Sequence, residues 1–277
     1  MAHQLKNSYT REFLAPNLVQ VEVPGGFPYE AFDGEAHIKP WSVLTLVESG
    51  RAFTFNRSES DPNHSFLDLG YLYNVGMGFI GSGSTIFNKN LYNTELRKSP
   101  LTLTKKLLYA GNSSVNLLTQ VLHPDLTEPL VECQVQTILV SRETRKPVQL
   151  PDWWREKYQK YSQKEAALNW RLNQKRPNNL TSYSLTIQPS DCDPYFHVNW
   201  SNYLKFCCDG LLGSNLKSSG LTVLKQPQIK IANFTFLKEC NAGEQLSVIF
   251  WTEGKELCFE IENQDKDVVY QAHLEVH

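Results

Sequence analysis

Two acidic residues and a histidine stand close together in the second half of the chain. Residues 191–199 read Asp-Cys-Asp-Pro-Tyr-Phe-His-Val-Asn, and a helical pattern starts soon after them. A carboxylate such as Asp193 can attack a carbonyl carbon or take a proton from water. Histidine titrates near neutral pH, so His197 can orient a substrate or move a proton. Backbone N–H groups at a helix start can stabilise negative charge that develops on a carbonyl oxygen.

The elements that would position these residues are a strand, a turn and a helix. Residues 183–187 alternate as a short strand does, and the next residues are rich in proline and aspartate, which favour turns. Residues 201–212 carry an apolar stripe at helical spacing, with Ser201 as predicted N-cap and Gly213 as predicted stop. Further strands are predicted at residues 228–238, 245–252, 257–263 and 268–276.

The first half of the chain repeats this order of elements. A turn is followed by a predicted helix over residues 41–53, and then by predicted strands at 79–87, 101–109, 115–123 and 130–141. Aligning His37 with His197 also aligns Asp33 with Asp193. Shared spacing within a shared order of elements indicates an internal duplication.

A connecting segment separates the two repeats. Residues 152–176 lie between prolines and place aromatic and aliphatic residues near one helical face, which predicts one long helix. The predicted organisation is therefore an N-terminal domain over residues 1–150, a connecting helix over 151–177 and a C-terminal domain over 178–277.

Composition excludes several classes of protein. The 277 residues include 41% hydrophobic and 20% charged residues, so the chain is not wholly disordered. A net charge of −2 argues against a generally basic nucleic-acid binder, and no stretch approaches the length of an apolar membrane span. None of the six cysteines forms a C-x-x-C pair, which gives a zinc site little support. The start of the chain has no apolar signal region, so we expect a cytoplasmic protein, with mitochondrial import as the alternative.

The loop and helix together resemble a known family. Asp191–Pro194, His197–Asn199 and Asn202–Leu204 resemble the signature of the 4-hydroxybenzoyl-CoA thioesterases and of the acyl-ACP thioesterases. Asp33, His37 and Glu48, followed by Gly50 and Arg51, resemble the family pattern in the first repeat. The resemblance implies an α+β fold of the tandem, or double, hotdog type, in which two antiparallel sheets each wrap around a central helix.

The resemblance also implies an activity and its residues. The implied reaction is hydrolysis of a fatty-acyl or related thioester of CoA or acyl carrier protein to a free acid and a thiol, with no metal and no prosthetic group. Asp193 matches the catalytic aspartate, His197 assists, and Glu48 is the acidic candidate on the facing wall of the first repeat. The oxyanion donor would be the Trp200 N–H. The candidates for substrate binding are Trp200, Asn199, Tyr195 and Asn202. The sequence leaves open whether the chain forms a homo-oligomer.

The same alignment separates the two repeats. Residue 40 is equivalent to Trp200 and is a proline, which has no N–H to donate. The sequence therefore predicts one competent site, in the second repeat.

Two alternatives stay open at this stage. Tyr195 replaces an asparagine of the acyl-ACP thioesterases, and Gln228 lies near the place of an additional catalytic glutamate. Both departures favour a protein that binds acyl thioesters with weak or no turnover. A hotdog hydratase or dehydratase is the second alternative.

Overall fold

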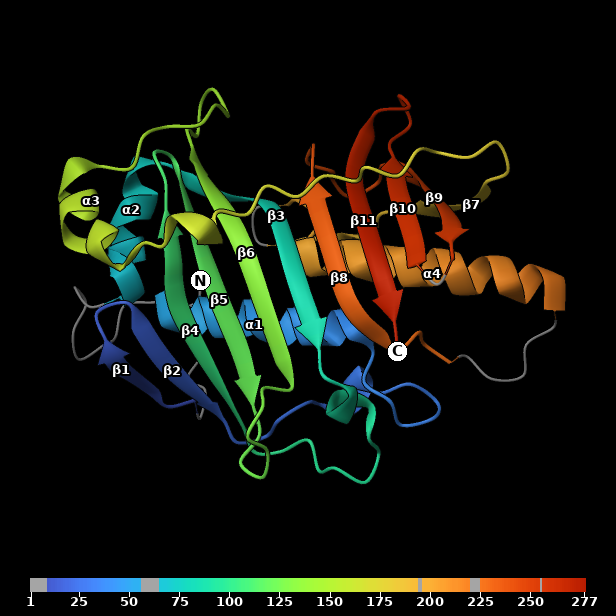
Figure 1. Ribbon diagram of the computed structural model, residues 1–277. Helices are drawn as coiled ribbons and strands as arrows, with labels where there is room; N and C mark the ends of the chain where they lie inside the picture. The colour runs from blue at the N-terminus through green and yellow to red at the C-terminus, as the bar shows by residue number, and fades with distance from the viewer. Residues whose placement is uncertain (1–8, 56–64, 194–195, 220–224, 255) are drawn as a thin grey trace. The chain divides into compact units, whose positions relative to one another are not determined.

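A computed structural model describes residues 9–55, 65–193, 196–219, 225–254 and 256–277 (Figure 1). Contacts between residues divide the chain into two compact units, each assembled from segments that are distant in sequence. Unit 1 comprises Met1–Pro28, Leu46–Gly83 and Leu96–Asn169, and unit 2 comprises Tyr29–Thr45, Ser84–Glu95 and Trp170–His277.

Unit 1 contains an antiparallel sheet whose inner face is mostly aliphatic. Leu103 and Leu107 are almost fully buried and lie opposite Val121 and Leu117 on the next strand. The strands predicted in the first half are confirmed to within one or two residues at most ends, whereas the first two strands were not predicted. The order of neighbours is β1 (Arg11–Ala15), β2 (Leu18–Val23), β4 (Leu101–Ala110), β5 (Ser114–Leu122), β6 (Val131–Val140) and the first part of β3 (Met77–Phe87).

Unit 2 contains a second antiparallel arrangement of strands, and every one of its strands was predicted. Val248 and Phe250 turn the same face of their strand inward, because side chains two residues apart share a face. The order of neighbours is β8 (Ile229–Phe236), β11 (Val268–Val276), β10 (Glu256–Glu262), β9 (Gln245–Glu253) and β7 (Thr181–Thr186).

Two long helices carry the predicted apolar stripes. Helix α1 (Pro40–Phe55) buries Val43, Leu44 and Val47, and helix α4 (Trp200–Ser219) lies along the sheet of unit 2 (Figure 1). The prediction that Gly213 stops the second helix is wrong. A Cβ atom at Gly213 would lie 2.4 Å from Cε2 of Tyr183, so this glycine lets α4 approach β7 closely.

The predicted long connecting helix is wrong. Only α3 (Asp152–Tyr158) is α-helical, and short 3-10 turns follow at Gln159–Tyr161 and Lys164–Ala166. The connector instead binds β4 through a side chain and through its backbone. The Ala110 N–H donates to Ser162 Oγ (2.9 Å), and the Gln163 N–H donates to the Leu108 carbonyl oxygen (2.7 Å). These tertiary hydrogen bonds replace those that would continue the helix.

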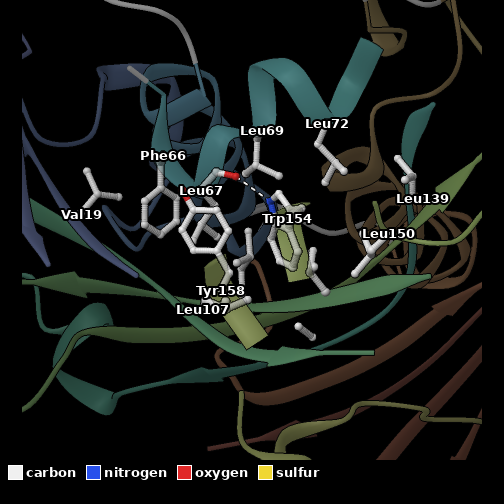
Figure 2. Close-up of a cluster of buried hydrophobic side chains, with 13 residues drawn as sticks. Val19, Phe66, Leu67, Leu69, Leu72, Leu107, Leu139, Leu150, Trp154 and Tyr158 are labelled. Carbon is white, nitrogen blue, oxygen red and sulfur yellow. Dashed lines mark hydrogen bonds between the residues drawn. The ribbon is translucent and has the colours of Figure 1, made fainter. Parts of the chain in front are cut away.

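Trp154 anchors this connector in the core of unit 1. Its indole N–H donates to the Leu67 carbonyl oxygen (2.7 Å), and its ring is completely buried (Figure 2). Leu67 precedes helix α2 (Leu69–Val75), so the bond ties α2 to α3. The buried cluster comprises Val19, Phe66, Leu67, Leu69, Leu72, Leu107, Ala110, Val115, Leu117, Leu139, Leu150, Trp154 and Tyr158. Over the described part of the chain, none of the helices combines the length and apolarity needed to cross a membrane.

Candidate functional site

The turn between β7 and α4 brings two of the predicted site residues together. The Asp193 N–H donates to the His197 carbonyl oxygen (2.7 Å), and the Phe196 N–H donates to the Asp193 carbonyl oxygen (2.9 Å). Phe196 takes a left-handed conformation with φ of 68° and is 81% exposed. Such a conformation is costly for a bulky side chain and is often found at functional sites. Tyr195 lies outside the described residues.

Asn199 and Asn202 join this turn to α4. Asn199 Oδ1 accepts hydrogen bonds from the Ser201 N–H (3.1 Å) and the Ser201 hydroxyl (2.9 Å). Asn199 is therefore the N-cap, and the prediction of Ser201 is wrong because the cap lies two residues earlier than predicted. Asn202 Nδ2 donates to the Asp191 carbonyl oxygen (2.9 Å). Both amide side chains thus fix the loop.

A buried carboxylate holds the loop from the other side. Asp191 is 5% exposed, and its Oδ2 accepts from the Gln188 N–H (2.9 Å). Its Oδ1 accepts from Lys205 Nζ (2.8 Å), which comes from the second turn of α4. The loop after β7 and the first turns of α4 are therefore joined by hydrogen bonds into one structure.

The predicted catalytic residues of unit 2 lie on this structure. Asp193 and His197 are partly buried, and His197 Nε2 lies 3.5 Å from Glu239 Oε2. Trp200 is the first residue of α4, and its buried ring lies 6.0 Å from the ring of Phe234. Glu239 was not predicted, because no motif around it signals proximity to the loop. A carboxylate near the imidazole can fix the tautomer and orientation of that ring.

The loop before α1 has the same backbone structure. The Asp33 N–H donates to the His37 carbonyl oxygen (2.8 Å), and the Ala36 N–H donates to the Asp33 carbonyl oxygen (3.1 Å). Ala36 takes a left-handed conformation with φ of 62° and stands where the other loop has Phe196. Helix α1 begins at Pro40, as α4 begins at Trp200.

The carboxylate of Asp33 is occupied by backbone donors. Oδ1 accepts from the N–H groups of Glu35 and His37 (2.9 Å each), and Oδ2 accepts from the Gln226 N–H (3.2 Å). These bonds favour a structural role for Asp33. Helix α1 begins with Pro40, which has no N–H, whereas α4 begins with Trp200, which has one.

Glu48 belongs to unit 1, where it forms a two-pronged ion pair with Arg51. Glu48 Oε2 accepts from Arg51 Nε (2.7 Å), and Glu48 Oε1 accepts from Arg51 Nη2. Burial lowers the pKa of Arg51, but Glu48 and Tyr73 outweigh burial, and the pKa is raised above its ordinary value. Between the ion-pair and catalytic interpretations of Glu48, the geometry favours the ion pair.

All six cysteines are free thiols. Burial raises the pKa of Cys240 and of Cys258 to about 11, so these thiols stay protonated at neutral pH and are poor nucleophiles. Among the residues that the structure describes, no group of three His, Cys, Asp or Glu side chains could hold a metal ion.

Comparisons with known proteins identify the fold. No family model matches the sequence, and no curated protein matches it. The chain is similar in structure to a 12:0-ACP thioesterase from Umbellularia californica, with a TM-score of 0.69 and 14% identity over 96% of this chain and 99% of that one. It is also similar to an acyl-ACP thioesterase from Bacteroides thetaiotaomicron, with a TM-score of 0.66 and 13% identity over 94% of this chain and 98% of that one.

A third structure agrees with these two. A candidate oleoyl thioesterase from Lactobacillus plantarum has a TM-score of 0.68 and 13% identity over 98% of this chain and 96% of that one. The likeness spans nearly the whole length of every chain compared. The chain therefore has the hotdog fold of these thioesterase structures.

Proposed function

We propose that the chain hydrolyses acyl thioesters of CoA or of acyl carrier protein, at a site built on Asp193, His197 and the start of α4. One observation carries the proposal: the loop hydrogen bonds hold Asp193 and His197 together directly before the first turn of a long helix. The fold shared with acyl-ACP thioesterases supports the same reaction.

The chemistry follows from these positions. A substrate carbonyl oxygen at the first turn of α4 would accept a hydrogen bond from the Trp200 N–H and lie at the positive end of the helix dipole. Asp193 would take a proton from water as the water oxygen bonds to the carbonyl carbon. The C–S bond then breaks, and the thiolate takes up a proton. His197, oriented by Glu239, would assist the proton transfer.

The competent site is proposed for the second repeat alone. Pro40 occupies the position of Trp200 at the start of α1, and Asp33 accepts three backbone N–H groups. The first loop therefore lacks the amide that the proposed mechanism uses.

We further propose that the chain is a tandem hotdog. The paired loops before α1 and α4 support a duplication, with domains over residues 1–150 and 178–277 and a connector over 151–177. The role of Glu48 as an acidic site residue of the first repeat stays a prediction. Substrate contacts by Trp200, Asn199, Tyr195 and Asn202 and a cytoplasmic or mitochondrial location stay predictions.

A binding protein without turnover is the second candidate. Tyr195 and Gln228, which depart from the acyl-ACP thioesterase pattern, favour it. Such a protein would retain acyl thioesters without releasing thiol.

The two candidates differ in one measurement. Purified protein is mixed with a panel of acyl-CoAs and acyl carrier protein thioesters, and released thiol is measured. We expect catalytic release that depends on Asp193. Tight binding of the same thioesters with no release above the uncatalysed rate would instead establish the binding protein.

A further inference from the structure

A charged side chain lies on the buried face of the unit 1 sheet. Lys105 is in the middle of β4, on the same face as Leu103 and Leu107, and it is 5% exposed. Both leucines have hydrophobic partners across the strand, Val121 and Leu117. Lys105 therefore stands in a polar row between two aliphatic rows.

The polar row continues across the next two strands. Lys105 lies opposite Thr119 on β5, and Thr119 lies opposite Cys133 on β6. Thr119 is 2% exposed and Cys133 is fully buried. Directly paired residues have neighbouring side chains on one face of a sheet, so these polar groups are adjacent.

Helix α1 adds charges next to the row. The Glu48–Arg51 pair belongs to α1, and both side chains interact electrostatically with Lys105. Lys105 Nζ lies 5.7 Å from the centre of the Phe55 ring. Glu48 forms its ion pair with Arg51, so the groups that stabilise the Lys105 ammonium here are the Glu48 charge, without a direct ion pair, and the Phe55 ring. Among the described residues, no hydrogen bond to that ammonium is found.

In unit 2, the strand positions that match this row of unit 1 carry apolar residues. Gly50 and Gly210 are equivalent residues of α1 and α4, and Cβ atoms there would lie 3.0 Å from Leu103 Cδ2 and 2.9 Å from Val248 Cγ1. Leu103 and Val248 are therefore equivalent. Two residues further along each strand, Lys105 corresponds to Phe250.

The whole row is exchanged along with that lysine. Phe250 lies opposite Phe259, and Phe259 lies opposite Ala272. The equivalents of Glu48 and Arg51 in α4 are Cys208 and Leu211. At the matched positions, unit 2 therefore has an apolar row where unit 1 has the row of Lys105, Thr119 and Cys133. Burying an ammonium whose partners are an aromatic ring and a carboxylate already paired with an arginine costs free energy, which supports another role for it.

We propose that Lys105 and Thr119 form a binding site in unit 1 for the carboxylate of an aliphatic ligand. An ammonium and a hydroxyl are donors suited to a carboxylate, and the leucine rows on either side suit an aliphatic chain. The carboxylate comes from a free fatty acid or from the far end of an acyl chain that is bound as a thioester. The site does not depend on the proposed role of Asp193.

Calorimetric titration with decanoate, and with decanol as the uncharged probe, tests the site. Lys105→Met removes the charge and retains an apolar chain of similar length. Lys106→Met is the matched control, because Lys106 is the exposed neighbour on the opposite face of β4. We expect decanoate to bind Lys105→Met about tenfold or more weakly than wild type, and Thr119→Val more weakly to a smaller degree. The affinity for decanol should be the same in all variants, and Lys106→Met should bind decanoate as tightly as wild type does.

A second titration identifies the source of the carboxylate. Acyl-CoAs that end in a carboxylate are compared with acyl-CoAs of equal length that end in a methyl group. A preference for the terminal carboxylate that Lys105→Met abolishes assigns the site to the acyl chain, and dependence with decanoate alone assigns it to a free acid. Equal binding of every probe to Lys105→Met and Lys106→Met overturns the site. If the wild-type protein binds decanoate through Lys105 but releases no thiol from acyl-CoAs, the proposal of thioester hydrolysis is wrong and the proposal of a carboxylate site is retained.

Discussion

The two halves of this chain share a backbone and differ in chemistry. The loops before α1 and α4 make the same turn hydrogen bonds and place a left-handed residue at the same point, Ala36 or Phe196. Side chains at matched positions are nevertheless different in kind. Pro40 corresponds to Trp200 in the alignment of the two repeats, and Lys105 corresponds to Phe250. Because backbone hydrogen bonds define the turn, the side chains are free to diverge, and function is expected where they differ.

The first test of this comparison replaces the first residue of α4 with proline, the first residue of α1. Trp200→Pro removes the proposed oxyanion donor, and proline is well tolerated at the first position of a helix. Trp200→Ala keeps the N–H and removes the same ring from Phe234. We expect Trp200→Pro to release thiol about a hundredfold more slowly than Trp200→Ala, the usual effect of losing one oxyanion donor. Equal rates for the two variants would remove this amide from the mechanism.

The second test makes the row of unit 1 resemble that of unit 2. Burial, with a further contribution from Arg51, lowers the pKa of Lys105 to about 8, while Glu48 and Cys133 act in the opposite direction. At neutral pH the folded state therefore carries the cost of a buried ammonium. We expect Lys105→Met to raise the free energy of unfolding by on the order of 2 kcal/mol in the absence of ligand.

The pH dependence of that gain has a definite sign. The folded state loses the Lys105 proton near pH 8, and the unfolded state near the ordinary value of 10.5. Across this window the unfolded state binds more protons, so the stability contributed by this group in wild type rises with pH. Denaturant titrations should show the advantage of Lys105→Met shrinking from pH 8 upward. An advantage that stays constant through pH 10 would mean that folding does not lower the pKa of Lys105.

The smallest effect concerns the helix cap. Asn199 caps α4 through Oδ1, whereas the equivalent residue before α1 is Lys39, whose Nζ donates to the Glu30 carbonyl oxygen instead. We expect Asn199→Ala to lower the free energy of unfolding by about 1 kcal/mol. Lys39→Ala should change it by less than about 0.5 kcal/mol. Thermal and urea unfolding of both variants would show whether the two caps differ in this way.

Much of the fold could be predicted because its periodicities are local. Strands β7 to β11 and helices α1 and α4 carry their apolar residues at regular spacing, and all were found. The prediction of a long connecting helix failed because the helical spacing of apolar residues could not show that Ser162 and Gln163 bind β4. Strand β1 has only five residues, and its three apolar residues are consecutive, so its sequence does not show the alternation that its burial has.

The candidate site was predicted where it is contiguous in sequence. Asp193, His197 and Asn199 lie within seven residues of one another, and the motif locates them together. Glu239 follows β8 and is distant from His197 in sequence, so no local motif indicates that the two side chains lie close together. Lys105 did carry one: it continues the alternation of Leu101 and Leu103, which places it on the buried face, unlike Lys106.

The most direct test compares the two equivalent aspartates. Asp193→Asn and Asp33→Asn make the same chemical change in loops with the same backbone, and thiol release from acyl-CoA is measured for both folded variants. A site in the second repeat alone predicts at least about a hundredfold loss for Asp193→Asn, the scale of a lost general base, and a much milder loss for Asp33→Asn. Unchanged turnover in Asp193→Asn, or equal losses in the two variants, would contradict it.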